Sequence, residues 1–336
     1  MQDDDTELDA RIKAMISGYR RTQVVYLMVK LGIPGKLRDG AAHAGELAAL
    51  CDADPGTLLD LLRALTADGL LEETAPGTEA FLLTPLGARL CQPSLASSAL
   101  FGGEEWYRAW GAGLSAVRGG SSGFEAAYGV PFWQYLTARP GTALAFGRLM
   151  TSSAENWIPA FAADERFGSL STIVDVGGGH GHVLAAILRS HPRLSGVLFD
   201  VPSAAETGTE VLRAAGVLGR CAVRDGSFFD AVPGDGDGYL LCRVLCDWPD
   251  QDAARILARC RRGMRDGSSL FVVGRLTDGG ATAGNPVLDL HMRFLTGGRE
   301  RSRYEYESLL TPAGFTIRGV SQVGGTDLSV IWAATA

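Results

Sequence analysis

The sequence predicts an α/β protein, in which a parallel sheet covered by helices on both faces follows an all-helical region with a winged-helix pattern. Short apolar runs alternate with helical stretches in the second half of the chain. These runs are Thr172 to Val176, Gly196 to Asp200, Gly238 to Leu241 and Ser269 to Val273. A glycine-rich turn, residues 177–181, follows the first run directly. Such alternation is typical of βα units, whose crossover helices cover a parallel sheet.

The N-terminal region has helical periodicity and one short hairpin pattern. Apolar side chains recur at helical spacing between residues 7 and 33, at Ile12, Met15, Ile16, Tyr19, Val25, Met28 and Leu31. Residues 46–65 predict a helix-turn-helix, and residues 70–84 predict a short hairpin, or wing. A winged helix can bind DNA, but Arg63 is the only cation of the second predicted helix. We therefore disfavour a DNA-binding role.

Three regions follow from these patterns. Residues 1–95 are the winged-helix-like domain, residues 96–165 are a helical connector rich in aromatic side chains, and residues 166–336 are the α/β domain. Most of the connector's aromatic side chains are expected to be core. Within the α/β domain, the glycine-rich stretch 278–284 is predicted to be a flexible loop.

The composition is that of a globular protein without a nucleic-acid partner. The chain has 336 residues, of which 46% are hydrophobic, and a formal net charge of −7. The densest basic run, residues 259–265, lies in the last turns of a predicted helix, where cations favour the C-terminus. The acidic start precedes no signal-peptide core and no apolar run is long enough to span a bilayer, so we expect a cytoplasmic protein without membrane contact. The six cysteines form no C-x-x-C pair, which disfavours disulfides and a zinc knuckle.

The glycine turn and the acid that follows it predict a nucleoside pocket. Residues 173–181 read Ile-Val-Asp-Val-Gly-Gly-Gly-His-Gly, and Asp200 closes the next apolar run 19 residues after Gly181. Glycines let a ligand approach the backbone, and a carboxylate at the next strand tip suits a ribose diol. A dinucleotide fingerprint needs a third glycine where this chain has His182. The leading candidate is therefore S-adenosylmethionine (SAM), and the alternative is a purely structural turn.

Five motifs occur in a fixed order after the winged-helix pattern. They are Val-Asp-Val-Gly-Gly-Gly-His-Gly (174–181), Phe-Asp-Val-Pro (199–202), Gly-Ser-Phe-Phe (226–229), Cys-Asp-Trp (246–248) and Gly-Gly-Arg-Glu-Arg (297–301). With these motifs the chain resembles, over nearly its whole length, the SAM-dependent O-methyltransferases of plant and bacterial secondary metabolism. The resemblance implies a homodimer built through the N-terminal helices, a Rossmann-like catalytic domain and a small aromatic or polyketide acceptor.

The resemblance also implies a set of cofactor-binding positions. In chain order these are Asp175, Gly177, Gly179, Asp200, Val201, Ser227, Phe228 and Cys242. The first three would border the amino-acid part of SAM, Asp200 would hold the ribose, and Ser227 and Phe228 would flank the adenine. Cys242 falls where bacterial relatives usually have a serine, which disfavours a hydrogen bond to the cofactor from this position.

Acceptor-binding positions are implied in the same way. Phe146 and Met150 match an F-x-x-x-M pair on the connector, Met292 matches a methionine on the opposite wall, and Trp106 belongs to the same aromatic region. Thioethers suit this role because sulfur packs well on aromatic rings and adapts to their shape. The alternative for each methionine is ordinary core packing.

The chain departs from the family at the catalytic position. The family motif normally reads His-Asp-Trp, and its histidine takes the acceptor's proton; this chain has Cys246 there, and Gly274 at the position of the glutamate that orients the histidine. Asp247 and Glu300 remain. Loss of both partners indicates a changed mechanism, in which Asp247 and Glu300 position the substrate.

Three routes for the acceptor's proton stay open. Cys246 has an ordinary pKa of about 8.5, but its thiolate would risk methylation beside SAM. His291 precedes Met292 and is either a base or a hydrogen-bonding wall residue. The third route uses no base, because an already acidic hydroxyl needs only alignment, which can supply roughly 7–11 kcal/mol.

Four functions are compared at this point. The first is O-methylation of a small phenolic or polycyclic metabolite. The second keeps SAM but performs decarboxylation, hydroxylation or a pericyclic step, and the third is a non-catalytic binding protein. A metal enzyme that uses Cys246, Asp247 and His291 is disfavoured because no metal-ligand spacing supports it, so no metal is predicted.

Overall fold

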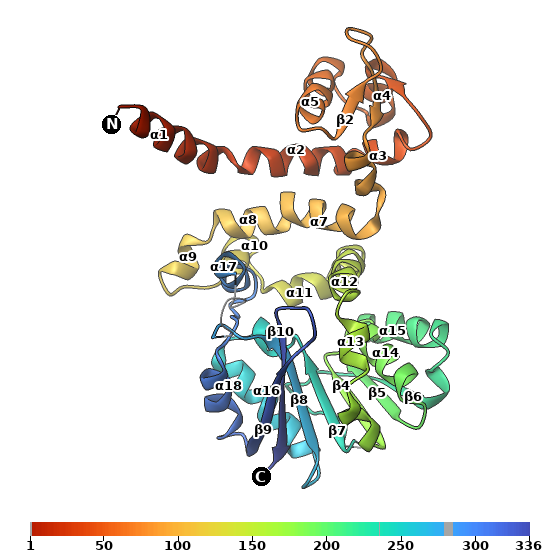
Figure 1. Ribbon diagram of the computed structural model, residues 1–336, viewed down its shortest axis with the longest axis vertical. Coiled ribbons are helices and arrows are strands. Elements are labelled where there is room, and N and C mark those ends of the chain that lie inside the picture. Colours follow the sequence, from red (N-terminus) through yellow and green to blue (C-terminus); the bar gives the residue numbers. More distant parts are fainter. Residues whose placement is uncertain (1, 235, 279–284) are drawn as a thin grey trace. The chain divides into compact units, whose positions relative to one another are not determined.

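The computed structural model of the chain describes residues 2–234, 236–278 and 285–336 (Figure 1). Six residues of the glycine-rich stretch expected to be a loop, 279–284, lie outside the described residues. The chain divides into two compact units, of which unit 1 ends at Arg108 and unit 2 begins at Ala109. The predicted connector thus contributes residues to both units.

Unit 1 contains the helical region and the winged-helix pattern that the sequence predicts. Its elements are α1 (Gln2–Ser17), α2 (Tyr19–Lys30), α3 (Ile33–Lys36), β1 (Ala42–His43), α4 (Ala44–Cys51), α5 (Pro55–Ala67), β2 (Leu71–Glu73), β3 (Ala80–Leu83), α6 (Pro85–Ala88), η1 (Arg89–Cys91) and α7 (Pro93–Gly103). The single helix expected over 7–33 is interrupted at Gly18, a residue with low helix propensity. The hairpin gains a third strand, in the antiparallel order β1-β3-β2.

Helix α1 presents apolar side chains to solvent. Four of them are between 51% and 71% exposed, namely Leu8, Ile12, Met15 and Ile16. By contrast, Met28 on α2 is fully buried in the core of unit 1, together with leucines of α4 and α5. A contiguous exposed apolar surface of this kind is typical of interaction surfaces.

Unit 2 begins with short helices and continues into the α/β domain. The helices before the sheet are α9 (Leu114–Val117), α10 (Gly123–Tyr128), α11 (Phe132–Thr137), α12 (Pro140–Ala154), α13 (Ile158–Ala162) and η2 (Glu165–Ser169), and α8 (Glu105–Gly111) contains the division between the units. The helices among the strands are α14 (His182–Ser190), α15 (Pro202–Ala214), η3 (Leu218–Arg220), η4 (Leu245–Asp247), α16 (Asp250–Gly263), α17 (Pro286–Leu295) and α18 (Arg303–Leu310).

The sheet of unit 2 confirms the predicted parallel arrangement. Its strands are β4 (Thr172–Val176), β5 (Ser195–Asp200), β6 (Cys221–Asp225), β7 (Gly238–Cys242), β8 (Ser269–Arg275), β9 (Phe315–Gln322) and β10 (Leu328–Thr335), in the order β6-β5-β4-β7-β8-β10-β9. Strands β4 to β8 pair in parallel, whereas β10 is antiparallel to β8 and β9. The chain changes direction across the sheet between β4 and β7, where α/β proteins bind ligands.

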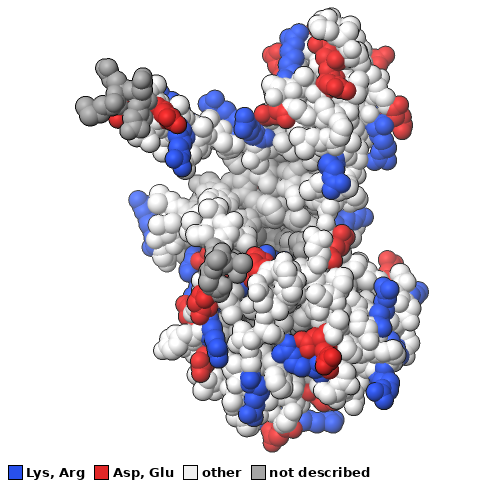
Figure 2. Space-filling model, viewed as in Figure 1, with Lys and Arg blue, Asp and Glu red and all other residues white. Residues whose placement is uncertain are grey.

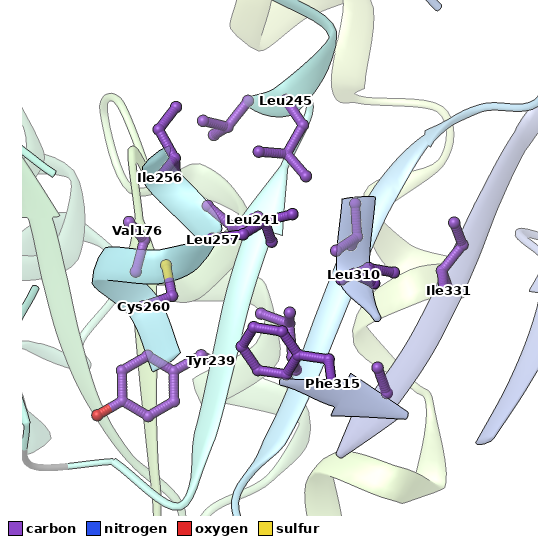
Figure 3. Close-up of a cluster of buried hydrophobic side chains, with 14 of the residues drawn as sticks. Val176, Tyr239, Leu241, Leu245, Ile256, Leu257, Cys260, Leu310, Phe315 and Ile331 are labelled. Carbon is purple, nitrogen blue, oxygen red and sulfur yellow. The ribbon is translucent and has the colours of Figure 1, made fainter. Parts of the chain in front are cut away.

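Helices cover both faces of this sheet. Side chains of α16 and α18 pack on one face, where Figure 3 shows Leu257 of α16 beside Leu241 of β7, with Cys260 and Leu310 in the same cluster. Side chains of α13, α14 and α15 pack on the other face. The two cores hold the strand ends in place, so loops that follow β4, β5, β7 and β8 are presented from a rigid support.

Two further surface observations bear on partners. No helix of the described residues is both long and apolar enough to cross a membrane. On the face shown in Figure 2, basic and acidic side chains are interspersed on each unit and form no continuous basic region among the described residues.

Candidate functional site

The glycine turn and Asp200 meet at the carboxyl ends of β4 and β5. The backbone N–H of Gly179 donates to Asp200 Oδ2 at 2.7 Å, and the N–H of Val201 donates to Asp200 Oδ1 at 2.7 Å. Gly177 and Gly179 have φ of +71° and +56°, and a Cβ added to Gly179 would point into open space. The turn therefore leaves a cradle that side chains do not fill, with a carboxylate fixed beside it.

Asp175 lies deep beside this cradle. It is 1% exposed, and neither carboxylate oxygen has a hydrogen-bond partner among the described residues. Burial, with the nearby carboxylate of Asp200, raises the pKa of Asp175 to about 7. Burial also raises the pKa of Asp200, although the N–H groups of Gly179 and Val201 oppose the increase. Two acids at one cradle fit a ligand that brings hydrogen-bond donors or positive charge.

Aromatic rings connect the glycine turn with the predicted acceptor helix. Phe228 lies within 3.4 Å of a Cβ added to Gly177, and its ring is 5.9 Å from that of Trp248. Trp248 stacks on Trp133 at 6.4 Å, and Trp133 is 5.7 Å from Phe146 on α12. This series, Phe228-Trp248-Trp133-Phe146, brings a predicted cofactor residue and a predicted acceptor residue into one neighbourhood.

Helix α12 also contacts the glycine turn directly. A Cβ added to Gly147 would lie 1.9 Å from the His180 ring, so the helix and the turn approach closely there. Phe146 and Met150, both partly buried, are carried by this helix on either side of the contact. The remaining cofactor positions lie at strand ends: the Ser227 hydroxyl accepts a hydrogen bond from the Phe229 N–H at 3.1 Å, and Cys242 ends β7.

Cys246 and Asp247 occupy η4, the turn after β7. The Cys246 thiol is 3% exposed, and its Sγ lies 3.9 Å from Asp247 Oδ1. Burial, with the charges of Asp247 and Glu300, holds the pKa of this thiol well above its usual range. Asp247 is only partly covered, and burial raises its pKa to about 7 while Arg243 opposes the increase. Asp247 as a residue is therefore less covered than Cys246, although its carboxyl is desolvated.

One buried arginine holds this turn. Arg301 is fully buried, and its guanidinium donates to the carbonyls of Leu245 at 2.6 Å and Trp248 at 2.7 Å, while Nε donates to Asp250 Oδ1 at 3.0 Å. A planar guanidinium suits several acceptors at once because its donors have fixed directions. The position of Cys246 and Asp247 thus depends on Arg301.

Glu300 lies between α17 and the end of β8. Its N–H donates to Asp289 Oδ1 at 2.8 Å, and its Oε1 is 3.7 Å from a guanidinium nitrogen of Arg275. The side chain is 5% exposed, and Oε2 has no hydrogen-bond partner among the described residues. Burial raises the pKa of Glu300, whereas Arg275 and Arg243 lower it.

Tyr306 occupies the space beside Gly274. A Cβ added to Gly274 would lie 3.0 Å from the Tyr306 hydroxyl oxygen, and Tyr306 is 1% exposed. Burial, with nearby Cys246 and Glu300, raises the pKa of this phenol. A longer side chain at Gly274 would therefore meet the phenol of α18.

The remaining predicted residues lie on α17 and in unit 1. His291 Nδ1 accepts a hydrogen bond from the indole N–H of Trp110 at 3.0 Å, and burial lowers the pKa of His291. Met292 is its partly buried neighbour. Trp106 belongs to unit 1, where its ring lies 5.6 Å from that of Phe101, and its predicted acceptor role stays a prediction.

Sequence reasoning missed four residues of this region. Arg243 adopts a left-handed φ of +56°, and Trp133, Arg301 and Tyr306 are the side chains described above. Arg301 was visible as the last residue of the Gly-Gly-Arg-Glu-Arg motif, and Arg243 as a cation directly after an apolar strand. Trp133 and Tyr306 carry no local signal that separates them from core aromatics.

The fold and the site define a class: an α/β domain that binds a nucleoside at the carboxyl ends of its central strands. Comparison with known proteins specifies it further. Residues 110–316 match the O-methyltransferase domain family, and residues 14–93 match the O-methyltransferase dimerisation domain.

Named relatives agree with these matches. Phenazine O-methyltransferase PhzM of Lysobacter antibioticus is 37% identical over 317 residues, which cover 93% of this chain and 92% of that protein. The structure of the mitomycin 7-O-methyltransferase MmcR covers all of both chains with a TM-score of 0.94 and 31% identity. The O-methyltransferase NcsB1 from neocarzinostatin biosynthesis, solved with SAM and 2-hydroxy-5-methyl naphthoic acid, has a TM-score of 0.84 and 29% identity, over 94% of this chain and 96% of that one.

The chain therefore belongs to the family of SAM-dependent O-methyltransferases, as its motifs predicted. It is a methyltransferase with a dimerisation domain in unit 1. The comparisons favour methyl transfer over the decarboxylation, hydroxylation and pericyclic alternatives. The replacement of the catalytic histidine by Cys246 remains an expectation, and its consequences are developed below.

Proposed function

We propose that this enzyme methylates the hydroxyl of a small aromatic or polyketide-type metabolite by alignment, without a protein base at position 246. The observation that carries the proposal is the environment of Cys246: a thiol 3% exposed, with a raised pKa, beside two acids. Raising the pKa disfavours the thiolate, and the thiolate is the form that accepts a proton. The relatives named for phenazine and the NcsB1 complex with a naphthoic acid support an aromatic acceptor.

The cradle fits SAM in its chemistry. The ammonium of its amino-acid part would pair with Asp175, whose buried oxygens have no hydrogen-bond partner among the described residues. The ribose hydroxyls would donate to Asp200, which keeps lone pairs beyond its two backbone bonds. Gly177 and Gly179 would border the amino-acid part, and Phe228 would flank the adenine. When bound there, SAM supplies an electrophilic methyl group on a sulfonium.

The acceptor would lie between α12 and α17. Phe146 and Met150 on α12 and Met292 on α17 supply aromatic and thioether surface, which suits a planar ring. Asp247 lies on the 246–248 turn and is less covered than Cys246. The Glu300 N–H donates a hydrogen bond to Asp289 of α17, which holds Glu300 beside this helix. In this proposal both acids position the acceptor.

The base-free route places a demand on the acceptor. An ordinary phenol, with a pKa near 10, is mostly protonated at neutral pH and is a poor nucleophile. A hydroxyl conjugated to a carbonyl or quinone is more acidic and ionises without help. Alignment behind the methyl group then suffices.

Formation of S-adenosylhomocysteine tests the proposal. Purified enzyme is incubated with SAM and with two matched series of acceptors. One series contains simple phenols, and the other contains hydroxyquinones or aromatic carbonyl compounds that carry a hydroxyl. S-adenosylhomocysteine and the methylated acceptor are quantified together. We expect equal amounts of both, and a rate that follows the acceptor's own ionisation. Acceptor conversion without S-adenosylhomocysteine would contradict methyl transfer, and equal rates for both series would contradict the base-free route.

We also propose that the enzyme is a homodimer. Support comes from the dimerisation domain at residues 14–93 and from the exposed apolar stripe of α1. A second copy of the chain would bury this stripe.

A further inference from the structure

Helix α12 and the glycine turn meet at one close contact, between Gly147 and the ring of His180. Three atoms of this ring, Cε1, Nε2 and Nδ1, lie within 2.7 Å of the point that a Cβ on Gly147 would occupy. Real Cβ atoms essentially never come within 3.0 Å of such neighbours, so the ring occupies space that glycine leaves free. By contrast, a Cβ on Gly141, in the first turn of the same helix, would meet nothing within 4 Å. The close approach is therefore a local property of Gly147.

Charged groups of the same helix region also face this turn. Burial lowers the pKa of His180, and the charges of His182 and Arg148 lower it further. Burial also lowers the pKa of His182, whereas Glu155, directly after α12, opposes the decrease. A lowered pKa favours the neutral imidazole at neutral pH. The His180 ring therefore meets Gly147 as an uncharged and partly buried group, on a helix that follows the turn from Arg148 to Glu155.

The helix that contacts His180 also carries the predicted acceptor residues. Phe146 directly precedes Gly147, and Met150 follows it on α12. The Phe146 ring is 5.7 Å from that of Trp133, which belongs to the predicted acceptor region. A shift of α12 against the turn would move both predicted acceptor residues, because a helix moves as a unit. Methyl transfer needs the nucleophile in line behind the methyl group, and a misplacement of about 1 Å can cost about 100-fold in rate.

We propose that His180 transmits SAM binding to the acceptor helix, so that α12 holds the acceptor in line with the methyl group only when SAM occupies the glycine turn. The inference rests on the proposed function and specifies how its alignment is achieved. SAM would border Gly177 and Gly179, and Gly179 directly precedes His180. A ligand that holds this turn in one conformation also holds the ring that packs on Gly147. His180 is thus a positioning residue, which acts on the acceptor through α12.

Such coupling makes the binding of SAM and of the acceptor cooperative. If the cofactor raises the affinity for the acceptor by some factor, the acceptor raises the affinity for the cofactor by the same factor. An enzyme that uses alignment in place of a base gains from this coupling, since an acceptor bound out of line does not react. His180→Ala should therefore lose the cooperativity, while its affinity for the cofactor alone stays within about fivefold of the unchanged chain.

Hydrogen exchange measured by mass spectrometry tests the transmission without any acceptor. The full-length protein is compared with and without saturating S-adenosylhomocysteine, and exchange is followed in peptides from α12 and from residues 176–188. In the unchanged chain we expect the ligand to slow exchange in both segments, by at least about threefold in α12. In His180→Ala we expect slower exchange in residues 176–188 alone. Equal protection of α12 in both proteins, or no protection of α12 in the unchanged chain, would overturn the proposal.

Kinetics of glycine variants test the contact from the side of the helix. Gly147→Ala places a methyl group where the His180 ring lies. With the acceptor that the S-adenosylhomocysteine assay identifies, we expect the acceptor KM to rise and kcat to fall, for a combined loss of about 10- to 100-fold in kcat/KM. Gly141→Ala is the matched control, because it makes the same change in the same helix where space is open, and we expect its kcat/KM to stay within about twofold.

A double variant separates this contact from general damage to the helix. Gly147→Ala combined with His180→Ala removes the overlap, and we expect its kcat/KM to recover to that of His180→Ala alone. Unchanged kinetics in Gly147→Ala, or a double variant no more active than Gly147→Ala, would contradict the role of the contact. Failure of every acceptor to yield S-adenosylhomocysteine would refute the proposed function, whereas the hydrogen-exchange result does not depend on an acceptor.

Discussion

At the scale of single residues, the site combines buried acids with a thiol that solvent barely reaches. Cys246 is covered, whereas Asp247 on the same turn is partly accessible. In the proposed mechanism the thiol contributes volume and packing, and the Asp247 carboxyl contacts the acceptor.

The first prediction concerns Cys246→Ala. Because the thiol shapes the wall and does not take a proton, we expect kcat/KM to fall by less than tenfold, which is about 1.4 kcal/mol of transition-state stabilisation. Steady-state kinetics with SAM and the acceptor measure this. Cys260→Ala, which removes a fully buried thiol from α16, controls for loss of core packing. A thousandfold loss in turnover with intact SAM affinity would require a chemical role for the thiol.

The second prediction concerns Asp200→Ala. If this carboxylate accepts the ribose hydroxyls, its removal should weaken SAM binding by about 1–3 kcal/mol. Titration calorimetry of the purified protein measures the affinity. Asp225→Ala is the control, since Asp225 pairs with Asp200 in register at the end of β6 but is exposed. Unchanged affinity in Asp200→Ala would refute the assignment.

The third prediction concerns pH and Asp175. The pKa of Asp175 is about 7 in the folded chain and about 3.9 in the unfolded chain. Between about pH 4 and pH 7 this carboxyl is therefore protonated in the folded state but ionised in the unfolded state. Stability contributed by the protonated carboxyl is therefore complete below about pH 4 and is lost as pH rises through 7. The Asp175→Asn variant lacks this pH-dependent contribution to stability. We therefore expect the Tm of the variant to fall less between pH 5 and pH 8 than the Tm of the unchanged chain.

Differential scanning calorimetry without SAM measures this difference. Asp247 has a similarly raised pKa and contributes equally to both proteins, so the comparison isolates Asp175 together with its electrostatic coupling to Asp200. Asp225→Asn, an exposed carboxyl, should reproduce the pH dependence of the unchanged chain. Parallel Tm curves for Asp175→Asn and the unchanged chain would show that the carboxyl is ionised throughout.

At the scale of elements, the decisive feature is how η4 is held. Arg301 lies two residues before α18, yet its guanidinium binds the carbonyls on both sides of Cys246 and Asp247. The turn after β7 and the loop before α18 thus behave as one unit, which fixes the wall opposite α12.

The fourth prediction concerns Arg301→Lys. Lysine cannot satisfy carbonyls in two directions, and buried acceptors left unpaired should cost about 2–4 kcal/mol in the free energy of unfolding. Urea denaturation followed by tryptophan fluorescence measures the loss. Arg299→Lys, in the neighbouring and more exposed ion pairs with Asp250 and Glu305, should cost less than about 1 kcal/mol. Equal losses in the two variants would contradict the role of Arg301.

At the scale of the whole molecule, the apolar stripe of α1 predicts the oligomeric state. Met15 and Ile16 are 71% and 70% exposed, and two added charges at these positions would oppose burial against a second copy. We expect the double variant Met15→Glu, Ile16→Glu to be monomeric at micromolar concentration and the unchanged chain to be dimeric. Light scattering decides between them, and Tyr304→Glu on α18, 76% exposed, is the control. A double variant that stays dimeric would place the interface elsewhere.

Local patterns were sufficient for much of the fold. The four predicted strands are present as β4, β5, β7 and β8, because each is an apolar run bounded by a turn. Strand β6 was missed because most of its side chains are not buried. Strands β9 and β10 were missed because this antiparallel pair is connected without the helix that separates the strands of a βα unit. The predicted helix over 7–33 was too long. The apolar spacing continues across Gly18, whereas the helix is interrupted at this residue.

The cofactor cradle was determined by the sequence itself, since a strand, a glycine turn and an acid at the next strand tip are close in the chain. The acceptor wall was decided only by the tertiary structure. Tyr306 meets Gly274 across α18 and β8, and Trp110 reaches His291, 181 residues away. Such contacts depend on how helices pack on a finished sheet. Periodicity records which face of a helix is buried and leaves open which distant side chain it will meet.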